Sequence, residues 1–76
     1  MKMKEFKESC FNSRGFDLNG VDVIVYPYDN YTILQPVDYN DEDNVMDGVM
    51  VENLSWKELR RAYNTLEKII ATQKRG

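Results

Sequence analysis

The stretch from Gly15 to Trp56 constrains the fold most, because it contains nine carboxylates and not one lysine or arginine. Five of the ten residues from Asp38 to Asp47 are acidic, so this part of the chain must stay at the surface. Residues 1–14 hold four bases and two acids, and residues 57–76 hold six bases and two acids. The net charge of −3 therefore hides an acidic middle between two basic flanks. The nine acids are Asp17, Asp22, Asp29, Asp38, Asp41, Glu42, Asp43, Asp47 and Glu52.

The length of 76 residues predicts a single domain that spans residues 1–76. A core of this size rarely contributes more than about 3–5 kcal/mol, and the single cysteine, Cys10, cannot form an internal disulfide. We therefore expect self-association as a homodimer. Because neither a hydrophobic leader nor an apolar run of about 18 residues is present, we expect a cytoplasmic protein with no membrane partner.

Two amphipathic helices are predicted, one near each end of the chain. Apolar residues between Met3 and Phe11 recur at helical spacing and predict a helix over residues 2–13. Ser55 and Glu58 form a capping box, which predicts that a second helix begins at this point. Its apolar residues follow the 3.6-residue period over about five turns. They are Leu59, Ala62, Tyr63, Leu66, Ile69 and Ile70.

Strands are predicted between the two helices. Asn19-Gly20 is a favoured two-residue hairpin turn, and a strand over residues 21–27 follows it. A short partner strand at residues 16–18 is left open. Further strands are predicted over residues 31–37 and 49–51, with Asp47-Gly48 forming a bulge or a tight turn.

The order of these elements predicts an α+β fold, in which a helix, a three-stranded antiparallel sheet and a second helix follow one another. Val21, Val23 and Val25 fall on one side of their strand and are expected to meet both helices. The other face of the sheet is then left to water or to a partner.

The residue types exclude several kinds of chemistry. With no histidine and one cysteine, a Cys/His zinc site and a Ser-His or Cys-His catalytic pair are excluded. Two calcium-loop registers, beginning at Asp41 and at Asp43, both fail at ligand positions. We expect no catalytic residues, no metal and no cofactor, and we expect that the protein is not an enzyme. Cys10 is interpreted as a small core residue.

A basic face on the second helix indicates a different function, binding of nucleic acid. The predicted order of elements resembles the double-stranded-RNA-binding domain, which uses a lysine cluster at the start of its second helix. Here Glu58 interrupts that cluster, and the acidic middle would repel a duplex. The residues of this alternative are Lys57, Arg60, Arg61 and Lys68.

The acidic middle favours imitation of nucleic acid over binding of it. Extended residues rise about 3.3 Å each, and duplex DNA presents a phosphate about every 3.4 Å along each strand. A carboxylate-rich surface can therefore occupy a basic groove and gain affinity from the release of counterions. Tyr28, Tyr31 and Tyr39 lie among the acids and could anchor such an interface.

The chain resembles the small acidic DNA-mimic proteins of bacteriophages, among them an inhibitor of the histone-like protein HU and several anti-CRISPR proteins. The resemblance covers the size, the small sheet between helices, and the acid-only block with its core Asp38-Tyr39-Asn40-Asp41-Glu42-Asp43. It implies a host-takeover protein that inhibits HU or a CRISPR effector in the bacterial cytoplasm, without touching nucleic acid itself. A small structural or assembly protein is the third interpretation. The predicted partner-binding residues are Asp38, Asp41, Glu42, Asp43, Asp47 and Glu52, supported by Asp22, Asp29 and Tyr39.

Overall fold

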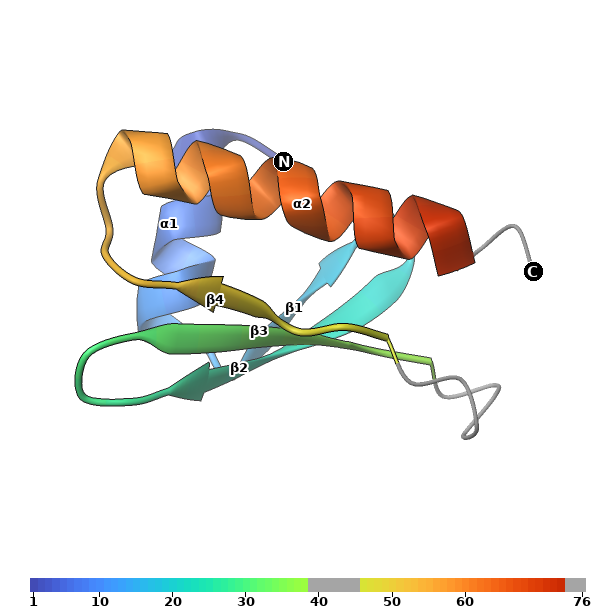
Figure 1. Cartoon of the computed structure of the whole chain (residues 1–76), viewed down its shortest axis with the longest axis horizontal. Helices are drawn as coiled ribbons and strands as arrows, with labels where there is room; N and C mark the ends of the chain where they lie inside the picture. Colours follow the sequence, from blue (N-terminus) through green and yellow to red (C-terminus); the bar gives the residue numbers. More distant parts are fainter. Residues whose placement is uncertain (39–45, 74–76) are drawn as a thin grey trace.

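A computed structural model of the chain describes residues 1–38 and 46–73, and Figure 1 shows the arrangement of their helices and strands. The α+β class and the succession of helix, antiparallel sheet and helix are confirmed. The sheet has four strands in place of the three predicted, because the short segment before Asn19 pairs as a strand of its own. The elements are α1 (Met3–Asn12), β1 (Gly15–Leu18), β2 (Val21–Pro27), β3 (Thr32–Val37), β4 (Val49–Val51) and α2 (Trp56–Gln73).

The four strands lie in sequence order, and each is antiparallel to the next. The turn between β1 and β2 is the predicted one: Asn19 and Gly20 both have positive φ, 54° and 85°. Positive φ at both central residues is what a type I′ hairpin turn requires, and Asn and Gly tolerate it best. This turn fixes the register in which Leu18 faces Val21.

Pro36 lies near the end of β3, where the missing amide proton costs least. Its partner in β2 is Val23, whereas pairing between β3 and β4 ends at Leu34 and Val49. The Val25 amide donates to the Arg14 carbonyl on the β1 side. Because the backbone N–H and C=O groups of alternate residues point to the same edge of a strand, those of Val23 also point toward β1. The nitrogen of Pro36 therefore points toward the β4 side beyond the paired residues, where no ladder bond is lost.

The segment before β4 is neither the bulge nor the turn that was predicted. Residues 46–48 run as an irregular connection, held because the Gln35 side-chain amide donates to the Met46 carbonyl at 2.7 Å. Gly48 lies against the same side chain: a Cβ at this position would lie 2.9 Å from Gln35 Oε1 and 3.3 Å from Ile33 Cγ2. The glycine therefore leaves room for the Gln35 side chain that holds this connection.

Only half of the predicted capping box forms at the start of α2. The Glu58 amide donates to the Ser55 hydroxyl at 3.2 Å, as an N-cap requires. The Ser55 amide, however, donates to the Asn53 side chain at 3.0 Å. The Glu58 carboxylate pairs instead with Arg61, which lies one turn further along the helix. Competition from this arginine therefore replaces the reciprocal bond of the box.

The core lies between the sheet and the two helices. Val23 and Val25 are buried as predicted, Val21 packs partly buried beside them, and Cys10 is a buried core residue. Phe6 of α1 is fully buried and makes edge-to-face contacts with Phe16 of β1 and Tyr63 of α2. The apolar positions predicted for α2 all face this core. The buried cluster comprises Phe6, Cys10, Leu18, Val23, Val25, Leu34, Val49, Val51, Leu59, Ala62, Leu66 and Ile70.

Two phenylalanines of α1 provide a direct test of this packing. Phe6→Ala should lower the free energy of unfolding by about 3–5 kcal/mol, because it removes a buried ring from contacts with both neighbouring elements. Phe11→Ala is the matched control: its ring is 68% exposed, so we expect a change within about 0.5 kcal/mol. Urea unfolding followed by circular dichroism measures both values. Similar losses in the two variants would contradict the packing described here.

Candidate functional site

Charge is divided between the two layers of the fold. Among the described residues, every charged side chain between Gly15 and Asn53 is a carboxylate, and these residues form the sheet and its connections. The described lysines and arginines lie on the two helices, at Lys2 just before α1 and at Arg14 just before β1. The sheet layer therefore presents only negative charge. The sequence alone did not show that the acidic stretch coincides with one layer of the fold.

One end of the sheet gathers carboxylates from all four strands or the residues beside them. This end carries the turn after β1, the start of β2, the end of β3 and the approach to β4 (Figure 1). Asp17 and Asp22 are on neighbouring strands, whereas Asp38 directly follows β3 and Asp47 lies shortly before β4. We call them the acidic row: Asp17, Asp22, Asp38 and Asp47.

Asp17 and Asp22 are the closest pair in the acidic row. They are direct partners in the register of β1 and β2, so both side chains are on the same face of the sheet. The backbone bond from Val25 to Arg14 places them in a non-hydrogen-bonded pair, where opposed Cβ atoms lie about 4.5–5.5 Å apart. Asp17 also accepts a bond from the Gly20 amide at 3.4 Å. Two exposed like charges at this separation repel each other.

The other predicted site residues are not all in the acidic row. Asp29 lies in the turn between β2 and β3, and Glu52 directly follows β4, so both are at the opposite end of the sheet. β2 alone separates the two ends by about 20 Å. The structure thus places Asp22, Asp38 and Asp47 at one end of the sheet and Asp29 and Glu52 at the other. Tyr39, Asp41, Glu42 and Asp43 lie outside the described residues.

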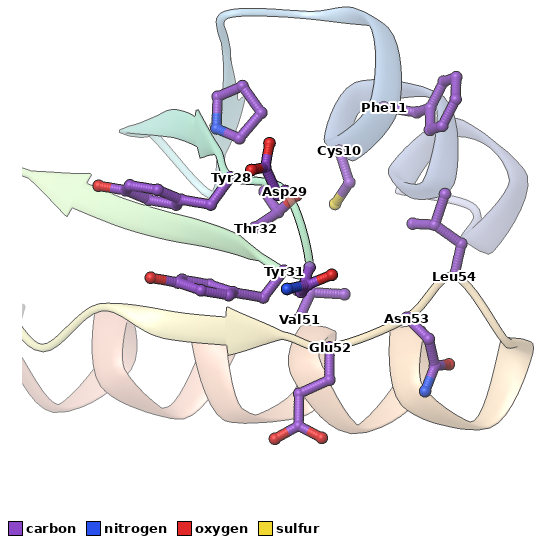
Figure 2. A pocket seen from close by; sticks show the side chains of 12 residues that line it. Cys10, Phe11, Tyr28, Asp29, Tyr31, Thr32, Val51, Glu52, Asn53 and Leu54 are labelled. Carbon is purple, nitrogen blue, oxygen red and sulfur yellow. The ribbon is translucent and has the colours of Figure 1, made fainter.

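A shallow pocket lies at the Asp29 end of the sheet, between the end of α1, the turn after β2 and the segment after β4 (Figure 2). Asp29 and Glu52 are the charged residues among those lining it. Burial raises the pKa of the Cys10 thiol to about 12, so at neutral pH it stays protonated and is no nucleophile. The rings of Tyr28 and Tyr31 extend away from the pocket, stacked with centroids 4.9 Å apart.

The sheet face that points away from the helices is apolar at its centre. The register places Tyr26 opposite Ile33, Ile33 opposite Met50, and Ile24 opposite Gln35 on this face. Tyr28 and Tyr31 continue it past the strand ends, since alternate residues share a face and the Tyr28 amide donates to the Tyr31 carbonyl. We call this surface the open face. It comprises Asp17, Asp22, Ile24, Tyr26, Tyr28, Tyr31, Ile33, Gln35, Val37 and Met50.

The open face is the feature that sequence reasoning left undeveloped. Alternation in β2 already placed Ile24 and Tyr26 opposite the valines. The same alternation in β3 shows Ile33 and Val37 on one side, but their placement next to Ile24 depends on the register. The sequence signal was therefore present, and the antiparallel pairing was needed to assemble it.

The basic face of α2 is only partly available. Lys57, Arg60 and Lys68 are exposed. Arg61, in contrast, pairs with Glu58, and its guanidinium donates to the Met50 carbonyl at 2.6 Å. Because β4 is an edge strand, this arginine occupies backbone that would otherwise be unpaired. One of the four residues of the nucleic-acid alternative thus has a structural role.

Comparison of the chain with protein-family models, with curated proteins and with solved structures finds no match. In the part of the chain that the structure describes, no helix is both long and apolar enough to cross a membrane. Within the same residues, no group of three or more His, Cys, Asp or Glu side chains is placed to hold a metal ion.

Repulsion within the acidic row predicts that a site variant is more stable than the natural protein. Asp22→Asn removes one of two facing carboxylates, so the free energy of unfolding should rise by about 0.2–1 kcal/mol at low salt. The gain should shrink near 1 M salt, where the screening length is about 3 Å. Asp29→Asn, in a turn at the other end, is the control and should show no such gain. An unchanged or lower urea midpoint for Asp22→Asn at low salt would disprove the repulsion.

Proposed function

We propose that this protein is a non-enzymatic inhibitor that imitates DNA and blocks a basic nucleic-acid-binding protein. The observation that carries the proposal is the sheet layer, whose described charged side chains are all carboxylates. Because Asp17 and Asp22 are on paired strands, the fold holds these two charges at a fixed spacing, as a duplex holds its phosphates. A disordered acidic tail would lose conformational entropy when it bound, whereas this surface is already ordered.

The acidic row supports this function through its geometry. Asp17 and Asp22 lie opposite each other on strands about 4.8 Å apart, a spacing of the same order as the phosphate rise of about 3.4 Å, and Asp38 and Asp47 lie at the same end of the sheet. A basic groove that meets this row exchanges its counterions for carboxylates, as it does for phosphates. Affinity and association rate should both fall as salt is added.

The partner is a DNA-binding protein with a basic groove, and the histone-like protein HU is the first to test, with a CRISPR effector as the second. The proposed setting is the cytoplasm of a bacterial host, where a bacteriophage protein of this kind would act. The inhibitor would compete with DNA for the groove without binding DNA itself. Arg61 is engaged by Glu58 and by the Met50 carbonyl at the edge of β4, which disfavours the alternative of direct nucleic-acid binding.

A competition assay tests this function with charge-matched variants. The protein should displace a labelled DNA duplex from HU at about 50 mM salt, and its affinity should fall as salt rises. The double variant Asp22→Asn with Asp47→Asn should weaken this displacement about three- to tenfold. Glu5→Gln with Glu8→Gln changes the net charge equally but on α1, so it should have little effect.

Two outcomes would overturn the proposal. In a gel shift, direct binding of the purified chain to duplex DNA would show that it is a nucleic-acid-binding module. Equal losses in the two double variants would show that net charge, and not the arrangement of carboxylates on the sheet, governs displacement.

A further inference from the structure

The open face exposes large aromatic and apolar side chains to solvent. Tyr26, Tyr28 and Met50 are 46%, 55% and 44% exposed, and Tyr31 lies stacked beside Tyr28. A tyrosine presents about 200 Å² when fully accessible, so the three tyrosines together expose on the order of 300 Å². The largest contiguous apolar patch on a typical monomer covers about 300–600 Å² and is often functional, so the open face is a candidate binding surface.

Nothing in the described part of the chain covers this face. Both helices pack on the opposite side, where Phe6, Leu59 and Leu66 are fully buried against the valines of the sheet. Ile24 and Ile33 in the centre of the open face are only half-buried, by their neighbours in the sheet. The apolar centre is therefore available to a partner.

The charges around the open face determine what kind of partner fits. Asp17 and Asp22 lie on the face itself at one end, and Asp29 and Glu52 lie beyond the other end, where they line the pocket next to α1. Arg61 approaches along the β4 edge, but its guanidinium is engaged by Glu58 and the Met50 carbonyl. The apolar centre is thus bounded by carboxylates at both ends.

This arrangement disfavours two of the three obvious occupants. A second copy docked face to face would bring carboxylates against carboxylates in either orientation, because both ends are acidic. Single-stranded nucleic acid could stack bases on the tyrosines, but its phosphates would meet the same carboxylates. A protein segment with an apolar centre and a basic residue at each end matches both the apolar centre of the face and the carboxylates at its ends.

We propose that the open face binds an apolar segment of the partner protein that carries lysine or arginine at both ends. The inference rests on the proposed function and adds to it the contact surface and the chemistry of the segment. Asp22 and Asp29 are seven residues apart along one antiparallel hairpin, about 20 Å, so an extended segment of about seven residues spans the face. The tyrosines and Met50 supply the desolvated centre of the interface, and the carboxylates supply its charged rim.

Two synthetic peptides of equal charge test this proposal. The probe is Lys-Lys-Phe-Ile-Phe-Lys-Lys, and the control is Lys-Lys-Ser-Gly-Ser-Lys-Lys, each labelled for fluorescence anisotropy. The protein should bind the apolar-centred peptide at least about tenfold more tightly, because only this peptide fills the apolar centre. Tyr26→Ser and Met50→Ser should each weaken its binding about three- to tenfold.

Trp56→Ser is the matched control, since Trp56 is equally exposed but lies at the start of α2. It should change the affinity less than about twofold. Circular dichroism checks that each variant is folded. If Tyr26→Ser is unfolded, the Met50→Ser variant alone tests the open face.

Equal affinity for the two peptides, or a larger loss of affinity with Trp56→Ser than with Met50→Ser, would overturn the inference. Tight binding of a thymidine oligonucleotide that competes with the peptide would also overturn it, as would a homodimer that Met50→Ser dissociates. The outcome is separable from that of the proposed function. Failure to displace DNA from HU with the peptide result intact would refute only the inhibitor role. If Tyr26→Ser and Met50→Ser leave the displacement of DNA from HU unchanged, only the binding role of the open face is refuted.

Discussion

The packing of Phe6 between the sheet and the second helix is the contact on which the rest of the structure depends. Its buried ring touches Phe16 of β1 and Tyr63 of α2, so the two helices and the first strand meet at one side chain. This contact directs the valine side of the sheet toward both helices. The opposite side, with the isoleucines and tyrosines, is consequently left outside. The division of charge between the layers follows from the same packing, because all the described bases are on the helices, at Lys2 just before α1, or at Arg14 just before β1.

Much of this fold could be predicted because its signals are local. The Asn19-Gly20 turn needs two positive φ angles, and the period of α2 repeats over five turns, so neither depends on distant residues. Strand β1 is only four residues long, which is too short for its own pattern to decide between strand and loop. The reciprocal bond of the capping box failed for another reason: Arg61 competes for Glu58, and sequence spacing does not rank such competitors.

The candidate site was less predictable because it depends on which strand ends coincide. A run of acids between Asp38 and Asp47 indicated one acidic surface, yet antiparallel pairing brings Asp17 and Asp22 to that end and leaves Asp29 and Glu52 at the other. The consequence is functional. Carboxylates at both ends with tyrosines, isoleucines and a methionine between them make a surface that combines electrostatic attraction with apolar contact. Charge alone gives fast, salt-sensitive association, whereas the apolar centre slows dissociation.

The partner is proposed to meet the sheet layer and not the helix layer. The chain has four isoleucines, of which Ile24 and Ile33 lie on the open face and Ile69 and Ile70 lie on α2. A protein labelled only at the isoleucine δ1 methyl groups, mixed with unlabelled HU, allows cross-saturation from the partner to be measured at these four positions. Contact through the sheet layer predicts loss of signal at Ile24 and Ile33, with Ile69 and Ile70 unaffected. Saturation of Ile69 in a complex that leaves Ile24 and Ile33 unchanged would contradict it.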